Sequence, residues 1–250
     1  MIKNRPIHFC ISTMTVIAFV ALSCSKTNTL VVVEKTLNLA NKQDVISRLR
    51  FGGNIKIACE GTSLTYGEDI GGTDTVTSYL LHAPTQAIYQ YPTTMIKDLN
   101  NPSITLSLRG YPGDRTTEGI SRWKDSTTAD ICIIEYGTND AYNFAAYSSG
   151  KVPLAAYKAQ LRILVERRVN QGAWVIVCLP PLLQSHDGTL NAYRTAAKQV
   201  AKDFYATVFD VEESIKNVPA PYSDAVHLNA RAYQKWGNDM AGLIQRMEGD

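Results

Sequence analysis

The sequence predicts an α/β fold, a three-layer α/β/α sandwich built on a five-stranded parallel sheet. Short, continuous apolar runs of strand length alternate along the chain with segments of helical periodicity. Continuous apolar runs are typical of strands covered on both faces, and regular alternation of strand and helix is typical of parallel sheets. The predicted strands are Ile55–Ala58, Ile104–Leu108, Ile131–Ile134, Val175–Leu179 and Val208–Val211.

Three segments around these strands carry apolar residues along one face of a helix, which predicts helices that pack against the sheet. Their tyrosine, tryptophan and methionine residues are interpreted as core. A shorter helix is predicted over Gln43–Arg50. The three stripes are Leu154, Tyr157, Leu161, Leu164 and Val165; Tyr193, Ala196, Ala197, Val200, Ala201 and Phe204; and Tyr233, Trp236, Met240, Leu243, Ile244 and Met247.

The composition is that of a globular protein with a core of its own. The chain has 250 residues, of which 45% are apolar and 19% charged, so a disulfide-stapled miniprotein and wholesale disorder are both excluded. The 25 basic residues stand against 23 acidic ones, and residues 1–23 contain Lys3 and Arg5 but no acid. The remainder is therefore neutral overall and has no charge excess for binding nucleic acid.

The first 24 residues have the features of an export signal. Lys3 and Arg5 precede the apolar segment Phe9–Leu22, which is shorter than the about 20 residues that span a membrane. Cys24, followed by a polar run, resembles the lipidated cysteine of bacterial lipoprotein signals. Cleavage nearby and an uncleaved anchor are the alternatives. We expect an exported protein, in the cell envelope or secreted, that touches a membrane only through a lipid anchor at Cys24.

The rest of the chain is expected to form one domain. Residues 25–50 are predicted to be a tether with a short helix, and residues 51–250 the folded domain. Cys59, Cys132 and Cys178 lie in or at the end of predicted strands, and no cysteine or histidine spacing fits zinc. We therefore expect buried free thiols, and neither a metal nor another cofactor.

Polar residues follow the predicted strands at the edge where a parallel sheet binds its ligand. The segments are GTSLTYG from Gly61, RGYPGD from Arg109 and YGTND from Tyr136, and DAVH from Asp224 precedes the last helix. Each alone is ordinary loop sequence. Their joint order and placement predict a single site.

These segments contain the parts of a nucleophilic catalyst. A serine hydroxyl needs a base, and the base needs a third group that fixes its tautomer, which Ser63, His227 and Asp224 can supply. The spacing of Asp224 and His227 lets the carboxylate bond the near ring nitrogen while the far one faces Ser63. Proton donors for a developing oxyanion are expected from the Ser63 and Gly113 amides and the Asn139 side chain.

Residues 51–247 resemble the SGNH, or GDSL-type, hydrolase superfamily. The resemblance rests on Ser63 in GTSLTYG, Gly113 in RGYPGD, Asn139 in GTND, and His227 with Asp224 in DAVH. It implies a flavodoxin-like sheet and an esterase that works through an acyl-enzyme without a cofactor. It also implies a catalytic triad of Ser63, His227 and Asp224, and an oxyanion hole of Ser63, Gly113 and Asn139. Thr62 stands where the family usually has Asp.

Several of these residues have a second interpretation. Ser63 can be an ordinary turn residue, and Gly113 can be required only for a positive φ. Asn139 and Asp140 can serve only to cap a helix. His186, followed by Asp187, competes with His227 but has no carboxylate at the triad spacing, so it is assigned to the pocket wall or solvent. The nucleophile elbow of α/β-hydrolases, G-x-S-x-G, fits less well, because Thr65 stands at the position of its last glycine.

Acidic residues near the strand ends are interpreted as support or surface. Glu60 and Glu135 end adjacent strands and are expected to support the loops rather than form an acid/base pair. Glu68, Asp69 and Asp74 are expected to form a solvated patch.

The predicted substrate is a small-molecule or polysaccharide ester, with O-acetylated carbohydrate favoured. Export favours envelope or extracellular material, and loop tyrosines can stack on sugar rings: Tyr66, Tyr111, Tyr136, Tyr142 and Tyr147. A lipase, lysophospholipase or thioesterase is the competing enzyme. A carbohydrate-binding module without catalysis is the alternative of another class, which Thr62 keeps open.

Overall fold

A computed structural model describes residues 41–69, 75–76, 86–124, 128–142, 150–185 and 188–246. The predicted export signal with Cys24, most of the tether, and the residues Asp74, Tyr147, His186, Asp187 and Met247 lie outside these ranges. Within them, no helix is both long and apolar enough to cross a membrane.

The main sheet has five parallel strands and confirms the predicted fold class. In space the order is β4-β1-β5-β6-β7, which is 2-1-3-4-5 in chain order and therefore flavodoxin-like. Val211, predicted at the end of the last strand, instead begins a helix. The bounds are β1 Ile55–Gly61, β4 Ile104–Gly110, β5 Ile131–Glu135, β6 Trp174–Leu179 and β7 Thr207–Asp210.

The continuous apolar runs of the strands fill two separate cores. Successive strand residues point to opposite faces, so Ile131 and Ile133 of β5 pack in one core while Cys132 and Ile134 pack in the other. Both faces of the sheet are therefore buried. Cys59, Cys132 and Cys178 are free and buried in these cores, as predicted.

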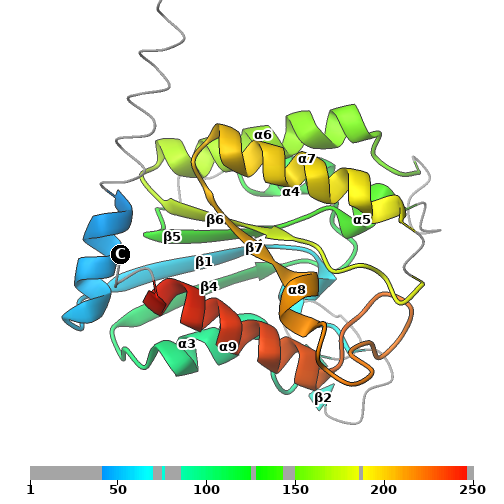
Figure 1. Cartoon of the computed structure of the whole chain (residues 1–250). Coiled ribbons are helices and arrows are strands. Elements are labelled where there is room, and N and C mark those ends of the chain that lie inside the picture. Colours follow the sequence, from blue (N-terminus) through cyan, green and yellow to red (C-terminus); the bar gives the residue numbers. More distant parts are fainter. Residues whose placement is uncertain are drawn as a thin grey trace, which may run out of the picture.

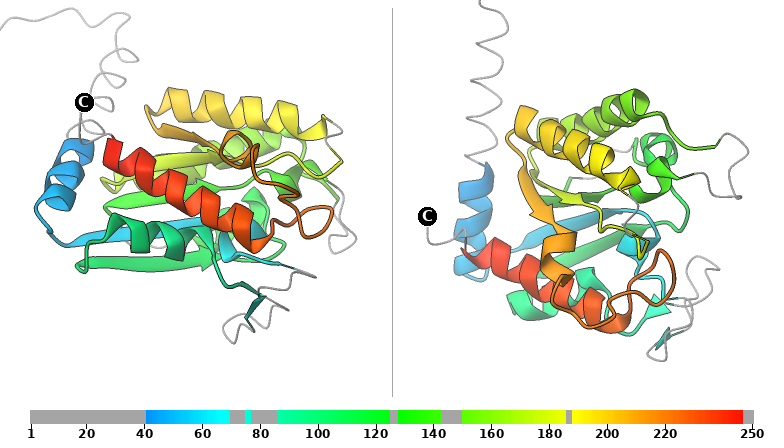
Figure 2. Two further views of the ribbon diagram at one scale, coloured as in Figure 1. Left: turned by 60° about the horizontal axis from the view of Figure 1, so that its bottom comes forward. Right: turned by 45° about the vertical axis from the view of Figure 1, so that its right-hand side comes forward.

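Helices cover both faces of the sheet (Figures 1 and 2). One layer contains α4 (Thr116–Arg122), α6 (Leu154–Asn170) and α7 (Thr189–Asp203), and the other contains α3 (Tyr91–Leu99), α8 (Val211–Ile215) and α9 (Ala230–Arg246). The three predicted stripes lie on α6, α7 and α9. The shorter helices α3, α4 and α8 were not predicted.

A further helix covers residues 41–50 and belongs to the folded domain rather than to a tether. Its Val45 is 1% exposed and packs in the same core as Ile55. The Arg48 guanidinium lies 2.7 Å from the carboxylate of Asp130, which precedes β5. The domain therefore begins before residue 51.

Two short helices follow directly on central strands. α2 (Ser63–Tyr66) begins two residues after the end of β1, and α5 (Thr138–Ala141) follows β5. A separate two-stranded antiparallel ribbon pairs β2 (Thr75–Val76) with β3 (Gln86–Ala87). Because β1 and β5 are neighbours in the parallel sheet, α2 and α5 lie at the same edge of it, where both strands end.

Candidate active site

Ser63, His227 and Asp224 form a continuous chain of hydrogen bonds. The Nε2 atom of His227 lies 3.1 Å from the Ser63 hydroxyl oxygen, and its Nδ1 atom lies 2.8 Å from Oδ2 of Asp224. The structure therefore brings together the three residues that the sequence selects, with the two ring nitrogens facing the expected partners.

The loop of His227 is held by hydrogen bonds from its backbone amides. Asp224 Oδ1 accepts hydrogen bonds from the backbone amides of Val226 at 2.7 Å and His227 at 2.6 Å, and the Ser223 amide donates to the His227 carbonyl at 2.9 Å. Burial raises the pKa of Asp224, but hydrogen bonds from the His227 amide and ring and from Val226 outweigh it, so its pKa is lowered. Asp224 is thus held as a carboxylate beside the imidazole.

Ser63 occupies the first position of α2. Thr62 caps this helix, since its hydroxyl oxygen accepts a hydrogen bond from the Leu64 amide at 3.1 Å. Ser63 is only 4% exposed. The cap and the burial together fix the direction of the Ser63 side chain toward His227.

A buried carboxyl group on β5 supports the segment before Ser63. Oε2 of Glu135 accepts hydrogen bonds from the Thr62 hydroxyl at 2.7 Å, the Thr62 amide at 3.2 Å and the Thr65 hydroxyl at 3.2 Å. Burial raises the pKa of Glu135 to about 7, against the lowering effect of these bonds. The interpretation of Glu135 as loop support is confirmed.

The predicted oxyanion donors lie on adjoining segments. The Asn139 side chain donates one hydrogen bond to the Asp114 carbonyl at 2.9 Å, which leaves its second N–H for another acceptor. The Tyr111 amide donates to the Gly61 carbonyl at 3.0 Å and joins the Gly113 loop to the end of β1. Gly113 has a φ of 83°, so its backbone also requires glycine. Their role as an oxyanion hole stays a prediction.

The alternative interpretations are resolved for the described residues. Asn139 does not cap α5, since the cap position is Gly137 and makes no side-chain bond. Glu60 pairs with Arg168, with Oε1 at 2.6 Å from the guanidinium, and it also accepts a hydrogen bond from Arg109 at 3.4 Å. No group of three or more histidine, cysteine, aspartate or glutamate side chains within the described ranges is placed to hold a metal ion.

Two sequence expectations are wrong. Glu68 and Asp69 are 6% and 1% exposed, so they do not form a solvated patch. Glu68 instead faces the site, with Oε2 3.4 Å from Nε2 of His227. Tyr66 and Tyr136 are 2% and 1% exposed, and therefore have no face free for a sugar. The sequence sign of Glu68 is its position five residues after Ser63, just beyond the end of α2.

Comparison with known families decides the classification. Residues 59–235 match the model of the GDSL-like lipase/acylhydrolase family, which is more than half of the chain. The chain belongs to the GDSL-like lipase/acylhydrolase family. This membership makes it a serine ester hydrolase. A comparison with curated proteins finds no match.

Solved structures share the fold of this GDSL-like hydrolase. An acetylxylan esterase from Geobacillus stearothermophilus is 20% identical with a TM-score of 0.58, over 78% of this chain and 94% of the other. An aryl esterase from M. smegmatis is 18% identical with a TM-score of 0.59, over 77% and 99%. A GDSL-like lipase from Parabacteroides merdae is 17% identical with a TM-score of 0.61, over 78% and 96%.

Proposed function

We propose that this hydrolase cleaves carboxylic esters with Ser63 as nucleophile, His227 as general base and Asp224 as the group that orients His227. The single observation that carries the proposal is the hydrogen-bond chain from the Ser63 hydroxyl through both ring nitrogens of His227 to Asp224. A serine so placed is activated, because the imidazole can take its proton as the oxygen attacks.

The reaction follows from these contacts. His227 Nε2 takes the Ser63 proton while the hydroxyl oxygen bonds to the ester carbonyl carbon, and the carbonyl oxygen becomes negatively charged. The Ser63 and Gly113 amides and the Asn139 side chain stabilise that charge. His227 then protonates the departing alcohol, which leaves an acyl group on Ser63. Water, deprotonated by His227, releases the acid and restores the serine.

The test is the substitution Ser63→Ala in the full chain. We expect turnover of an aryl acetate and labelling by a fluorophosphonate probe to disappear, with a thermal melt close to that of the parent protein. Ser214→Ala on α8 is the matched control, since its hydroxyl bonds only Asp239, and it should keep both activities. Labelled or active Ser63→Ala protein would remove Ser63 from its role.

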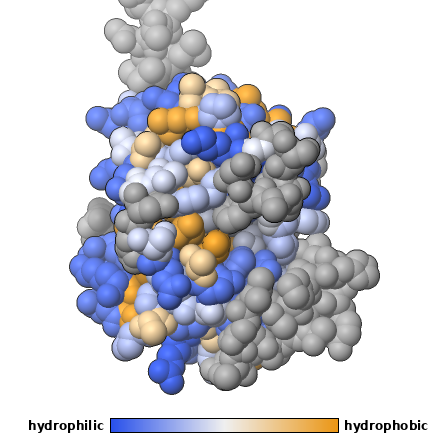
Figure 3. All heavy atoms as spheres, turned by 90° about the vertical axis from the view of Figure 1, so that its right-hand side faces the viewer, coloured by the Kyte–Doolittle hydropathy of each residue, from blue (hydrophilic) through white to orange (hydrophobic). Residues whose placement is uncertain are grey.

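For the substrate, we propose an O-acetylated carbohydrate. The solved structures with this fold include an acetyl-xylooligosaccharide esterase and acetylxylan esterases. On the face where the strands end, the described residues are mostly hydrophilic, and hydrophobic ones occur in small separate groups (Figure 3). Such a surface suits a hydroxylated alcohol better than a long acyl chain, which needs a continuous apolar surface.

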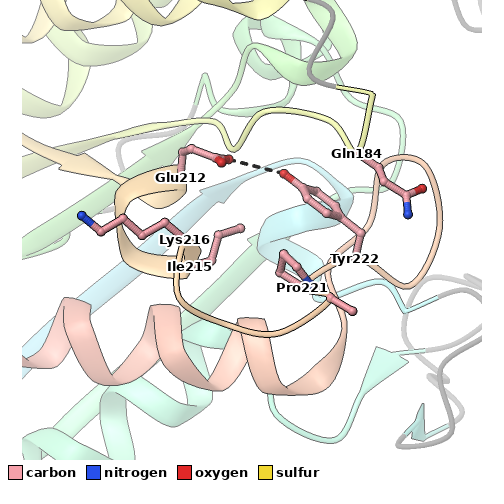
Figure 4. Close-up of a pocket in the computed structure, with 7 residues that line it drawn as sticks. Gln184, Glu212, Ile215, Lys216, Pro221 and Tyr222 are labelled. Carbon is pink, nitrogen blue, oxygen red and sulfur yellow. Dashed lines mark hydrogen bonds between the residues drawn. The ribbon is translucent and has the colours of Figure 1, made fainter.

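A pocket beside the histidine loop offers a place for a sugar ring. It encloses about 290 Å³, and Gln184, Glu212, Lys216 and Tyr222 are among its lining residues (Figure 4). The Gln184 amide donates to the Ala225 carbonyl at 3.2 Å, so the pocket wall is joined to the loop of His227. An aromatic side chain among hydrogen-bonding groups is the combination that carbohydrate rings use.

A chain-length series of p-nitrophenyl esters separates the candidate substrates. Preference for acetate, together with acetate release from acetylated xylan, supports the carbohydrate proposal. Preference for acyl chains of eight carbons or more would instead indicate a lipase, and hydrolysis of acyl thioesters a thioesterase. Binding of glycan with no acetate release at any pH would indicate a binding module.

We also propose export with lipidation at Cys24, on the basis of the basic, apolar and polar segments around it. When an expressing bacterium is grown with radioactive palmitate, we expect the protein to be labelled. We also expect to find it in the membrane fraction. Cys24→Ser should abolish the label, while Cys59→Ser, which removes a buried thiol, should retain it. A labelled Cys24→Ser protein would overturn the proposal.

A further inference from the structure

His227 faces two carboxylates, and only one of them is the triad acid. Asp224 binds Nδ1, whereas Oε2 of Glu68 lies 3.4 Å from Nε2, the nitrogen that also faces Ser63. The Glu68 side chain is 8% exposed and that of His227 is 14% exposed. A second carboxylate is therefore held, almost out of water, beside the nitrogen that exchanges protons in the proposed reaction.

Glu68 is held in this position by its backbone on both sides. Its amide donates to the Ser63 carbonyl at 2.9 Å, and its own carbonyl accepts from the Tyr233 hydroxyl of α9 at 2.9 Å. Glu68 also pairs with Gln86, the first residue of β3, through an isolated β-bridge. The placement of the carboxylate thus follows from the same segment that places Ser63.

We propose that Glu68 is a further catalytic residue, whose negative charge stabilises the protonated form of His227 and disfavours esters with an anionic acyl group. The inference rests on the proposed function and deepens it. In the resting enzyme His227 is neutral and has no proton at Nε2 that Glu68 could bind. The charge of Glu68 therefore acts only after Nε2 has taken the proton of Ser63, when the ring is positively charged.

The proton movements are consistent with this role. When Ser63 attacks, its proton moves to Nε2, and the new N–H lies within reach of Glu68 Oε2 as well as of the departing alkoxide. Glu68 holds the imidazolium by charge attraction and accepts no proton itself. The proton then passes to the alcohol oxygen, and the carboxylate is again without a donor on the ring.

The charge state of Glu68 depends on a small set of neighbours. Burial raises the pKa of Glu68, the facing His227 lowers it, and Asp224 raises it. Among the described residues, Tyr233 on α9 donates its hydroxyl hydrogen bond to the Glu68 carbonyl, and Asp69 is next in the chain. Protonation of His227 therefore favours the charged form of Glu68, and the two groups stabilise each other's charges.

The first test is the pH dependence of kcat/KM for Glu68→Gln, which keeps the size of the side chain and removes its charge. An opposite charge at this distance favours the protonated imidazole. We expect the acid limb of the profile to move to lower pH by about one unit, and the plateau of kcat to fall. Glu166→Gln, which removes an exposed charge on α6, should leave the profile unchanged.

The second test compares a neutral and an anionic acyl group on the same phenol, phenyl acetate and monophenyl succinate. We expect Glu68→Gln to raise kcat/KM for the succinate relative to the acetate by about tenfold at low ionic strength, because a repulsive charge is gone. Added salt should raise the same ratio in the parent protein, and this measurement needs no variant.

An unchanged acid limb and an unchanged substrate ratio in folded Glu68→Gln would overturn the inference, as would a parent ratio that salt does not alter. If Glu68 had a purely structural role, its substitution would lower kcat/KM equally for both substrates and leave the acid limb of the pH profile in place. Failure of the proposed function is seen separately, as activity or probe labelling that survives Ser63→Ala.

Discussion

The hydroxyl of Thr62 donates a 2.7 Å hydrogen bond to the buried carboxyl group of Glu135, which ends the neighbouring strand. Thr62 stands where the family usually has Asp, and Glu135 is 0% exposed. A second carboxylate at position 62 would place two like charges together out of water, which is costly. An uncharged donor at 62 therefore fits a chain that has its carboxyl group at 135.

Thr62→Val should destabilise the protein and impair its activity. The change removes both the bond to Glu135 and the acceptor for the Leu64 amide. We expect about 1–3 kcal/mol lower free energy of unfolding and a reduced kcat for an aryl acetate. Thr195→Val removes an exposed hydroxyl that bonds only within α7, and should cost far less. Equal effects of the two changes would contradict this account.

Glu135→Gln should change how stability depends on pH. Burial raises the pKa of Glu135 to about 7 from 4.5, so the folded state binds more protons than the unfolded state between these values. The stability contribution of Glu135 is therefore present at low pH and lost as pH rises through about 7. Glutamine has no proton to lose.

The measurement is the free energy of unfolding at pH 5 and pH 8 for both proteins. Glu135→Gln should reduce the fall between them by on the order of 2 kcal/mol. Glu166→Gln on the surface of α6 is the control and should follow the parent curve. Parallel curves for all three proteins would exclude a raised pKa at Glu135.

Gly61→Ala should disturb the contact between β1 and β5. A Cβ at this position would lie 2.2 Å from the Thr65 hydroxyl oxygen and 2.6 Å from the Glu135 carbonyl oxygen. We expect a loss of about 1–3 kcal/mol of stability and reduced activity. Gly242→Ala on α9 meets only the flexible end of Arg246, and should stabilise by up to about 1 kcal/mol. Thermal melts of both variants provide the comparison.

The three core cysteines should be inert in the folded protein. Burial raises the pKa of Cys59 to about 12 and also raises the pKa of Cys132 and Cys178. Because the thiolate is the reactive form, we expect no alkylation of these residues by iodoacetamide until the chain is unfolded. Peptide mapping by mass spectrometry reads each one separately. Modification of any of them in native protein would show that its core opens.

The sequence by itself determined the five strands, the three long helices and the set Ser63, His227 and Asp224. The strands could be predicted because burial on both faces leaves a continuous apolar run, as in Ile131–Ile134. Ser63, Asn139 and His227 could be selected because they follow or precede these elements in a fixed order. Helix periodicity and the apolar runs of strands are local signals, because neighbouring residues carry them. The flavodoxin-like order of the strands was implied only by the resemblance to SGNH hydrolases.

Only the tertiary structure decided which polar groups are buried and what they face. From their local sequence, Glu68 and Asp69 are predicted to lie on the surface, and residues 41–50 are predicted to belong to a tether. Their burial depends on contacts with chain-distant residues, such as Tyr233 for Glu68 and Asp130 for Arg48. A carboxylate has the same local sequence signal in water or beside an imidazole, because its environment is set by segments that meet only after folding.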